Sequence, residues 1–389
     1  MRTRLARPLF RGPATVANRQ ALCYTPAVRG PSDGRRRTGG HRLLFWGEEF
    51  AIDLGTANVH VCVRDAGIVV REASAIAYNQ ARRAVAVGTE ARRMAERGVP
   101  GVSVVRPLRG GTVANFDATV ELLRHCIRAA LGRRPILSPR VVVATPIEPT
   151  SVEYRALRDA LRAAGAGKVY DVPRALAAAI GAAVPLDGPE ARMVIDLGAG
   201  STDIGILSLG AITAGTTLHY GGDDLDEAIR RRLRRAHGIA IGRTVAEEVK
   251  VQVGAVQPDL AQSTDKLRSL LGNGGGNGSA LPQEEIPELL ARALLPVVSE
   301  VRWLLEELPA KHRTEVRETG VVLTGGTALL GGIGPLFAER LELPVTVARD
   351  PLSCTVLGLE SILSDLRALT LDGRRFSRAT QTATLGLGA

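Results

Sequence analysis

The chain has 389 residues, of which 45% are hydrophobic and 23% charged, enough for two or three domains with a sizeable core. Because only 3% are aromatic, we expect a core of Ala, Val, Leu and Ile. These figures exclude a wholly disordered chain, a collagen-like chain and a small disulfide scaffold, and no apolar run is long enough to predict a transmembrane helix.

The net charge of +10 is concentrated at the start of the chain. Residues 1–42 contain ten arginines and a single acid, Asp33, which leaves about +1 for all the rest. We predict a disordered Arg-rich extension over residues 1–42. Two origins for it stay open: a real tail, or a start codon assigned upstream of a true start near His41. Because the remaining chain is near neutral, we expect no nucleic-acid partner.

A hydrophobic cluster, Leu43, Leu44, Phe45 and Trp46, follows beside basic residues. It suits a short membrane-surface anchor, because Leu and Trp bury well at the lipid interface. It equally suits a lead-in that packs against the first strand, and both interpretations stay open.

Two strand–turn–strand units come next, over residues 50–63 and 193–207. Each has an apolar run of β type, then Asp-Leu-Gly, a short turn of small residues and a second apolar run. Asp53 and Asp196 occupy the same place in the two units. This long-range internal repeat predicts a duplicated domain with a site between the copies.

Alternating helices and strands surround these units and predict α/β layers. Between the units we expect helices over 116–131, 151–164 and 175–183 and strands over 140–145 and 168–172. After the second unit we expect helices over 224–237 and 245–253, a loop over 272–279, a helix over 284–308 broken or kinked at Pro296, a strand over 321–324, a helix after Gly325-Gly326, and a flexible tail over 369–389.

The four cysteines are widely spaced and form no CxxC pair. This pattern is typical of a reducing cytoplasm rather than of a disulfide framework or a zinc knuckle. We expect Cys62, Cys126 and Cys354 to be small buried hydrophobic residues.

The repeated Asp-Leu-Gly turn suits a nucleoside triphosphate. Backbone N–H groups of a turn that contains Gly can cradle phosphate oxygens, and the hydroxyls of Thr56, Ser201 and Thr202 can donate to them. The carboxylates of Asp53 and Asp196 can hold the waters of a bound magnesium ion. One such hairpin is common at strand ends, whereas two that face one another would form a clamp.

Three further features allow both a functional and a structural interpretation. Gly325-Gly326 is either a close-approach site under a base or ribose, or an ordinary strand–helix turn. Residues 222–226 form either a ribose-binding turn or a helix N-cap. Glu247 and Lys250 lie three apart on one helical face, where the structural interpretation is a solvated ion pair.

The order of these motifs resembles the actin, heat-shock chaperone and sugar kinase ATPase superfamily, and within it most closely bacterial actin, the MreB/Mbl family. The stretch from Arg106 to Asp117 matches as well. The other matching segments, over residues 48–368, include Asp-Leu-Gly-Thr-Ala-Asn, Asp-Leu-Gly-Ala-Gly-Ser-Thr, Gly-Asp-Asp-Leu-Asp-Glu-Ala-Ile and Leu-Thr-Gly-Gly, together with residues 177–181, 246–250 and 350–352.

The resemblance implies an α/β, actin-like ATPase fold of two lobes, each with a mixed sheet flanked by helices, and a nucleotide cleft between them. Lobe I would span 48–190 together with a C-terminal helix over 355–368, and lobe II would span 191–354. ATP and Mg²⁺ are the expected ligands. The protein would lie in the cytoplasm at the inner face of the cell membrane, assemble with itself into protofilaments, and serve cell shape beside membrane proteins of the rod complex and the cell-wall synthesis machinery.

The resemblance also implies binding residues by motif position. Magnesium would be held through water by Asp53 and Asp196. The phosphates would be held by Asp53, Leu54, Gly55, Thr56 and Asn58 opposite Asp196, Gly198, Gly200, Ser201 and Thr202, the ribose and base by Gly222, Asp223, Glu247 and Lys250, and the underside of the nucleotide by Thr324, Gly325 and Gly326.

The largest departure from the family pattern affects catalysis. Family members usually carry Glu-Glu-Pro before the helix at 175–183, with a carboxylate that positions the attacking water, and here the triplet is Pro173-Arg174-Ala175. Losing a positioned base costs roughly 10²–10⁴-fold in rate, so we expect ATP binding with slow or undetectable hydrolysis. Asp171 would substitute only after its loop is remodelled, and our hypothesis for Arg174 is a pairing with phosphate.

Smaller departures concern binding and assembly. Ala199 replaces a Gly where a positive φ is expected, and Thr327 replaces a Gly where we expect it to press on the base site. The Gly-rich run over 272–279 favours a flexible loop and weaker polymerisation. The leading hypothesis is a cytoskeletal scaffold. The alternatives are a degenerate, non-polymerising ATP-binding adaptor of the cell-wall machinery and, third, a small-molecule kinase of the same superfamily.

Overall fold

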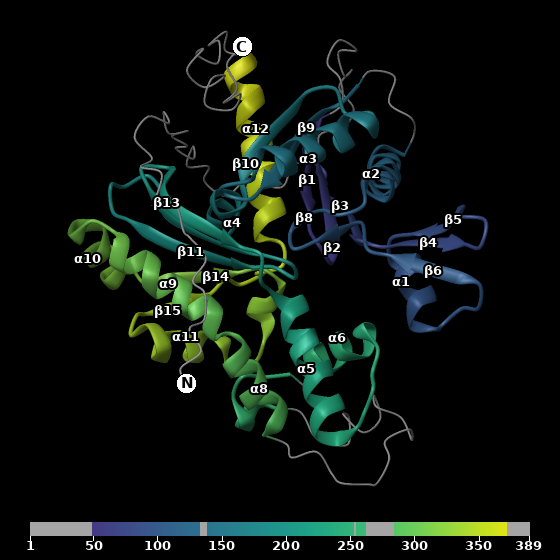
Figure 1. Cartoon of the computed structure of the whole chain (residues 1–389). Coiled ribbons are helices and arrows are strands. Elements are labelled where there is room, and N and C mark those ends of the chain that lie inside the picture. Colours follow the sequence, from purple (N-terminus) through teal and green to yellow (C-terminus); the bar gives the residue numbers. More distant parts are fainter. Residues whose placement is uncertain (1–48, 133–137, 253, 262–283, 372–389) are drawn as a thin grey trace, which may run out of the picture.

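The computed structural model describes residues 49–132, 138–252, 254–261 and 284–371. Two five-stranded sheets form the centre of the molecule (Figure 1). The predictions for residues 1–42, 43–46 and 272–279 lie outside the described residues, as does the predicted tail from residue 372 onward.

The first sheet has the strand order β10-β9-β1-β2-β3. Its central strand β1 is antiparallel to β2 and parallel to β9, so the sheet is mixed. Alternate residues of β1 face opposite sides, with Phe50 and Ile52 in one core cluster and Ala51 in another. The strands are β1 (Glu49–Leu54), β2 (Asn58–Val63), β3 (Gly67–Ala73), β9 (Arg140–Thr145) and β10 (Val169–Pro173).

The second sheet repeats this plan in the order β13-β12-β11-β14-β15. Its central strand β11 is antiparallel to β12 and parallel to β14. Asp53 is the next-to-last residue of β1 and Asp196 is the next-to-last residue of β11, which confirms the internal repeat. The strands are β11 (Arg192–Leu197), β12 (Thr202–Ser208), β13 (Ala211–Leu218), β14 (Val321–Thr324) and β15 (Val345–Val347).

Two helices fill the space between the sheets. α4 (Arg174–Gly181) and α12 (Cys354–Leu371) share one core cluster with Ala51 of β1 and Val194 of β11. They cross closely at two glycines: a Cβ on Gly181 would lie 1.8 Å from the Cys354 carbonyl oxygen, and a Cβ on Gly358 would lie 1.8 Å from that of Ala177. Only glycine permits this approach.

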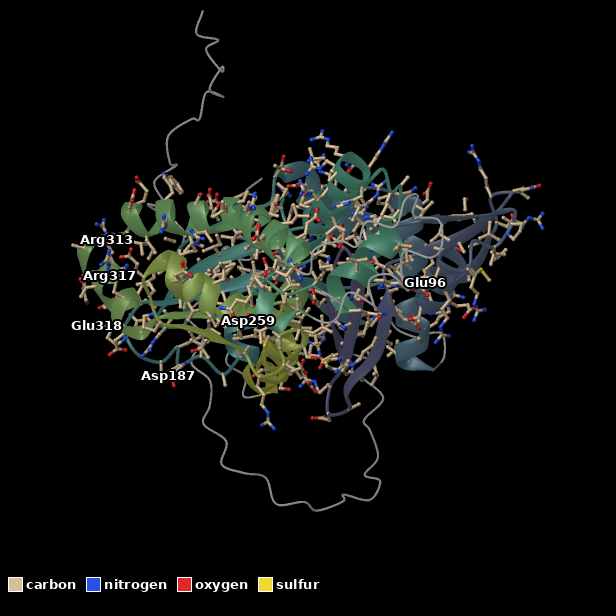
Figure 2. The ribbon with its side chains drawn as sticks, turned by 90° about the horizontal axis from the view of Figure 1, so that it is seen from below. Glu96, Asp187, Asp259, Arg313, Arg317 and Glu318 are labelled. Carbon is tan, nitrogen blue, oxygen red and sulfur yellow. The ribbon has the colours of Figure 1, made fainter. Side chains whose placement is uncertain are left out.

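The outer faces carry the remaining helices. α2 (Phe116–Leu131) and α3 (Ser151–Ala163) pack on the first sheet. The helices that pack on the second sheet are α5 (Gly222–His237), α6 (Arg243–Gln252), α8 (Glu285–Ala293), α9 (Leu295–Glu307), α10 (Ala310–Thr319) and α11 (Ile333–Leu341). Charged side chains such as Arg317 and Glu318 cover the outside of α10 (Figure 2).

Smaller elements complete the structure. We define the first half of the molecule as residues 49–181 and the second half as residues 192–347. A small three-stranded sheet, in the order β5-β4-β6, projects from the first half (Figure 1). The small elements are β4 (Ile76–Asn79), β5 (Ala84–Val87), β6 (Val102–Val105), α1 (Thr89–Glu96), the hairpin β7 (Leu108–Arg109) and β8 (Thr112–Val113), and the 3₁₀ helices η1 (Pro258–Leu260) and η3 (Gly326–Leu329).

The predicted α/β class and most of the predicted elements are confirmed. The predicted helix over 284–308 is broken into α8 and α9, with Pro296 in the first turn of α9, because proline lacks the N–H that a continuous helix needs. Cys62, Cys126 and Cys354 are buried and unpaired, as expected. The predicted division between the lobes at residues 190 and 191 remains a prediction.

Two predicted boundaries are wrong. The element that directly follows Gly325 is the short 3₁₀ helix η3, and the α-helix starts only at Ile333. The predicted tail starts at residue 369, whereas α12 continues to Leu371, because its last turns are rich in helix-forming Leu and Ala.

Candidate nucleotide-binding site

The turn after β1 forms one wall of the candidate site. Asp53 and Thr56 are both buried, at 8% and 4% exposure. Leu54, the last residue of β1, is buried in the core. The N–H of Gly55 donates to the carbonyl of Asn58 over 3.0 Å and closes a tight turn into β2. Asp53 pairs across the strands with His60, whose Nδ1 lies 4.0 Å from the carboxylate.

The turn after β11 forms the opposite wall with the same backbone bond. The Gly198 N–H donates to the Ser201 carbonyl over 2.9 Å. Asp196 is buried and accepts a 2.8 Å hydrogen bond from the Thr324 hydroxyl on the neighbouring strand. Thr202 is fully buried and donates to the Tyr220 carbonyl over 2.9 Å, so its hydroxyl is already engaged.

The two turns meet at glycines. A Cβ on Gly200 would lie 2.4 Å from the Thr56 hydroxyl oxygen, and a Cβ on Gly111 would lie 2.5 Å from the Ser201 hydroxyl oxygen. The Gly111 N–H donates to the Thr56 hydroxyl over 3.0 Å. The structure therefore brings together the predicted residues Thr56, Gly200 and Ser201, and it adds the β7–β8 hairpin, which the prediction did not place here.

Arg174 lies on the floor between the two walls as the first residue of α4. Its Nη1 is 2.5 Å from the Asp53 carboxylate, and its Nε is 3.6 Å from the carboxylate of Asp203 on β12. Arg174 is 9% exposed and Asp203 is fully buried. Asp53 thus competes with a phosphate for the Arg174 guanidinium, which we expected to pair with phosphate.

Burial and charge shift the three carboxyls in different directions. Burial raises the pKa of Asp53, but the Arg174 guanidinium and, to a lesser extent, the neighbouring His60 ring outweigh it, so the net pKa is below its ordinary value. Burial raises the pKa of Asp196 to about 7, despite Arg174. Burial also raises the pKa of Asp203. The carboxylates hold Arg174 in its charged form against the effect of burial.

These residues do not fit the predicted magnesium ion. Mg²⁺ takes ionised oxygen ligands and keeps several waters. The Asp53 carboxylate instead pairs with a guanidinium, and the raised pKa of Asp196 leaves that carboxyl partly protonated near neutral pH. Within the described ranges, no group of three or more His, Cys, Asp or Glu side chains is arranged to hold a metal ion.

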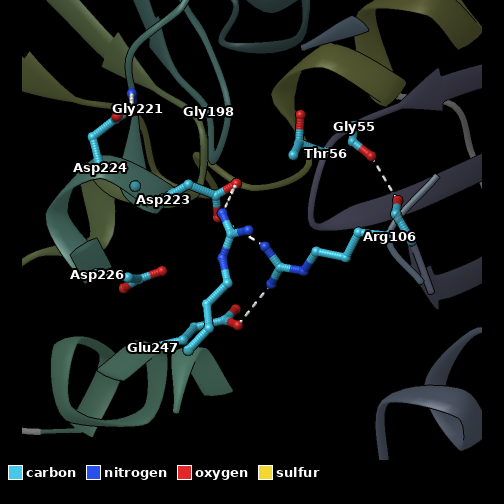
Figure 3. A network of polar contacts seen from close by, with 12 residues as sticks. Gly55, Thr56, Arg106, Gly198, Gly221, Asp223, Asp224, Asp226 and Glu247 are labelled. Carbon is cyan, nitrogen blue, oxygen red and sulfur yellow. Dashed lines mark hydrogen bonds and ion pairs between the residues drawn. The ribbon is translucent and has the colours of Figure 1, made fainter. Parts of the chain in front are cut away.

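Arg106 joins the two halves at the other end of the site (Figure 3). It lies between β6 and β7 and binds Asp223 through Nη1 at 2.8 Å and Glu247 through Nη2 at 2.9 Å. Asp223 also pairs with Arg243 at 2.6 Å, and Glu247 with Arg92 at 3.1 Å. Two residues that the prediction assigned to ribose and base are therefore held by arginines.

The structural alternative for Glu247 and Lys250, a solvated ion pair between them, is not the arrangement that the structure shows. The ammonium of Lys250 lies 2.8 Å from Asp226 and donates to the Gly222 carbonyl over 2.8 Å. Asp226 is almost fully buried, and burial raises its pKa to about 6 despite Lys250. A buried carboxylate attracts the ammonium more strongly than an exposed one does. Gly222 and Asp223 lie in the first turn of α5, which starts two residues earlier than predicted.

The turn after β14 is fastened to the turn after β11. Gly325 has φ +84°, and a Cβ there would lie 2.4 Å from the Leu197 carbonyl oxygen, so glycine is required. Its neighbour Gly326 is exposed. The Thr327 hydroxyl donates to the Gly198 carbonyl over 2.9 Å. The expected positive φ at Ala199 is wrong, because Ala199 is not among the described non-glycine residues whose φ is positive.

Several residues that were predicted to belong to the site do not lie in this cluster. Asn58 lines a separate cavity of about 490 Å³ together with His60 and Arg71. Asp171, the expected substitute base, accepts a 2.9 Å hydrogen bond from Tyr154 on α3. The cluster Leu43, Leu44, Phe45 and Trp46 lies outside the described residues.

Sequence reasoning missed Arg106 and Asp203. The signal for Asp203 was present, because a charged residue within the apolar run of β12 must find a buried partner. The signal for Arg106 was weaker: it lies in a matching stretch of the sequence, but its partners are more than a hundred residues away.

Comparisons with known proteins show the family and the fold. The family described as MreB/Mbl protein matches residues 47–371. The cell shape-determining protein MreB of Escherichia coli strain K12 is 37% identical over 323 residues, which cover 81% of this chain and 92% of that protein. The cell shape-determining protein Mbl of Bacillus subtilis strain 168 is 34% identical over 332 residues, which cover 84% and 98%.

Solved structures show the same fold. MreB5 of Spiroplasma citri bound to AMPPNP has a TM-score of 0.73 at 29% identity, over 84% of this chain and 99% of that one. The MamK double helical filament has a TM-score of 0.67 at 19% identity, over 82% and 98%. The predicted actin-like fold is confirmed, and the chain belongs to the MreB/Mbl family.

Proposed function

We propose that this chain is an actin-like cytoskeletal protein that binds ATP between its two sheets and assembles with itself into filaments for cell shape and cell-wall morphogenesis. The observation that carries the proposal is the pair of matching turns after β1 and β11, which meet at Thr56 and Gly200. Support also comes from relatives named for determining cell shape and from MreB5, solved with AMPPNP and with ADP.

The proposed nucleotide chemistry is binding with slow or no hydrolysis. Arg174 stands where the family pattern has a carboxylate, and Asp171 is engaged by Tyr154, so neither is free to position an attacking water as a base. The magnesium ion predicted at Asp53 and Asp196 remains a prediction, and it is at odds with the guanidinium beside Asp53.

The proposed location is the cytoplasmic face of the cell membrane, with membrane proteins of the rod complex and of cell-wall synthesis as partners. The described part of the chain has no helix that is long and apolar enough to cross a bilayer. The proposed contact with the membrane surface is the hydrophobic cluster Leu43, Leu44, Phe45 and Trp46.

Sedimentation of the full chain with ATP, with ADP and without nucleotide, followed by electron microscopy of the pellets, tests the assembly. We expect filaments that depend on nucleotide. If no condition gives a pellet while the protein still binds ATP, the scaffold proposal fails and the non-polymerising adaptor replaces it. Binding of neither nucleotide would overturn both.

A further inference from the structure

Arg174 places a permanent positive charge where both walls of the candidate site converge. Its guanidinium contacts Asp53 of the first sheet at 2.5 Å and approaches Asp203 of the second at 3.6 Å. One Asp203 carboxylate oxygen is buried without a hydrogen-bond partner among the described residues. The two sheets thus direct negative charge at one cation, and arginine keeps its proton at any pH the protein meets.

The charge of this cluster is close to that of a site that already holds a divalent cation. The cluster holds three buried aspartates, and Arg174 adds one positive charge to it. An acid at position 174, as the family pattern has, would make the cluster more negative by two charges. That difference equals the charge of one Mg²⁺ ion. An arginine in place of an acid therefore changes the charge of the cluster by as much as a bound Mg²⁺ would.

The geometry of the guanidinium suits contact with phosphate. Arginine presents five N–H donors in a planar fork that matches phosphate oxygens. Nη1 faces Asp53 and Nε faces Asp203, while Nη2 donates to no described residue. Arg174 is also the first residue of α4, where the free backbone N–H groups of a helix favour an anion.

We propose that the Arg174 guanidinium takes the place of the divalent cation, so that this chain binds ATP and ADP without Mg²⁺. The inference rests on the proposed nucleotide binding and goes beyond it, because it names the counter-charge. A magnesium ion at Asp53 would have to displace the guanidinium and leave it buried without its partner, which is unfavourable.

The test compares ATP affinity of the full chain in excess MgCl₂ and in excess EDTA by isothermal titration calorimetry. For the unchanged chain we expect dissociation constants within about threefold of each other. For Arg174→Glu we expect binding in MgCl₂ that weakens by about tenfold or more in EDTA. Arg174→Lys keeps the charge and should remain independent of Mg²⁺.

Arg158→Glu is the matched control. It makes the same change of charge on α3, where Arg158 donates to Tyr154 rather than to the cluster, and it should behave as the unchanged chain. Thermal unfolding of every variant checks that it folds.

The outcomes separate this inference from the proposed function. An unchanged chain that binds ATP about tenfold or more tightly with Mg²⁺ than with EDTA overturns the inference and leaves nucleotide binding intact. An unchanged chain that binds no nucleotide in either condition overturns the proposed function. If Arg174→Glu binds nucleotide while the unchanged chain does not, Arg174 blocks the nucleotide site. Because the unchanged chain alone decides between these outcomes, a variant that fails to fold does not weaken the test.

Discussion

Asp53 and Asp196 occupy matching places on the central strands of the two sheets, yet their carboxyl pKa values shift in opposite directions. Arg174 contacts Asp53 directly, which lowers the pKa of that carboxyl in spite of its burial. Burial dominates at Asp196, while Asp203 and Asp53 add like charge, and its pKa rises to about 7. One guanidinium has therefore made the two repeats chemically different.

The raised pKa of Asp196 predicts a pH-dependent cost to stability. An unfolded Asp ionises near its ordinary pKa of 3.8, whereas the folded carboxyl keeps its proton up to about pH 7. Between these values the folded state binds more protons, so its stability falls as the pH rises. The free energy of unfolding of Asp196→Asn, relative to that of the unchanged chain, should therefore rise by on the order of 2–4 kcal/mol from pH 4 to pH 8.

Urea unfolding at several pH values measures this gain. Asn preserves the acceptor for the Thr324 hydroxyl, so the hydrogen bond is kept while the charge is removed. Asp187→Asn, on an exposed aspartate (Figure 2), is the matched control. A difference between Asp196→Asn and the unchanged chain that does not vary with pH would refute the assignment.

At the scale of elements, α4 and α12 determine how closely the two sheets approach one another. They share a core cluster with residues of both sheets, and their backbones touch at Gly181 and Gly358. α12 follows the whole second half in the sequence, yet it packs against residues of the first half. The crossing therefore depends on glycine at positions far apart in sequence.

We expect Gly181→Ala to destabilise the chain by about 3 kcal/mol or more, because the new Cβ would lie 1.8 Å from the Cys354 carbonyl oxygen and neither backbone can yield cheaply. Denaturant unfolding measures the loss. Gly242→Ala is the control, since nothing lies within 4 Å of a Cβ there and its φ is not positive. Equal stability of both variants would mean that the helices do not cross as described.

The elements that could be predicted are those whose signal lies within the element itself. The helix over Phe116–Leu131 has an amphipathic period, an Asn cap before it and a Gly after it, and both ends were placed correctly. The small sheet β5-β4-β6 was missed, because its short strands are interrupted by charged residues and are defined by their partners. In the same way, Asp53 and Asp196 could be predicted from a repeated motif, whereas the pairing of Arg174 with Asp53 spans 121 residues and leaves no local signal.

At the scale of the whole molecule, several ion pairs between described residues tie the first half to the second, among them those of Arg92, Arg106 and Arg174. Arg106 reaches from the first half to Asp223 and Glu247 on two helices of the second. Its side chain is 24% exposed, so the ion pairs are only partly shielded from water. Such contacts contribute more to the relative placement of the halves than to overall stability.

We expect Arg106→Ala to speed amide hydrogen exchange in the first turns of α5 and α6, with a loss of only about 1 kcal/mol in global stability. Hydrogen exchange with mass spectrometry measures the first effect and denaturant unfolding the second. Arg243→Ala is a matched control, because Arg243 binds the same Asp223 from within the second half. If both variants exchange alike, Arg106 does not couple the halves.

The three buried cysteines have a practical consequence for measuring such motions. Burial raises the pKa of each of the Cys62, Cys126 and Cys354 thiols to about 12, so almost none of these groups is a thiolate at neutral pH. Because only the thiolate is alkylated, iodoacetamide will modify them at the rate at which the surrounding structure opens. Cys126 is a buried residue of α2 in the first half, whereas Cys354 lies where α12 meets α4. Their separate alkylation rates therefore distinguish local opening of the first half from separation of the two sheets.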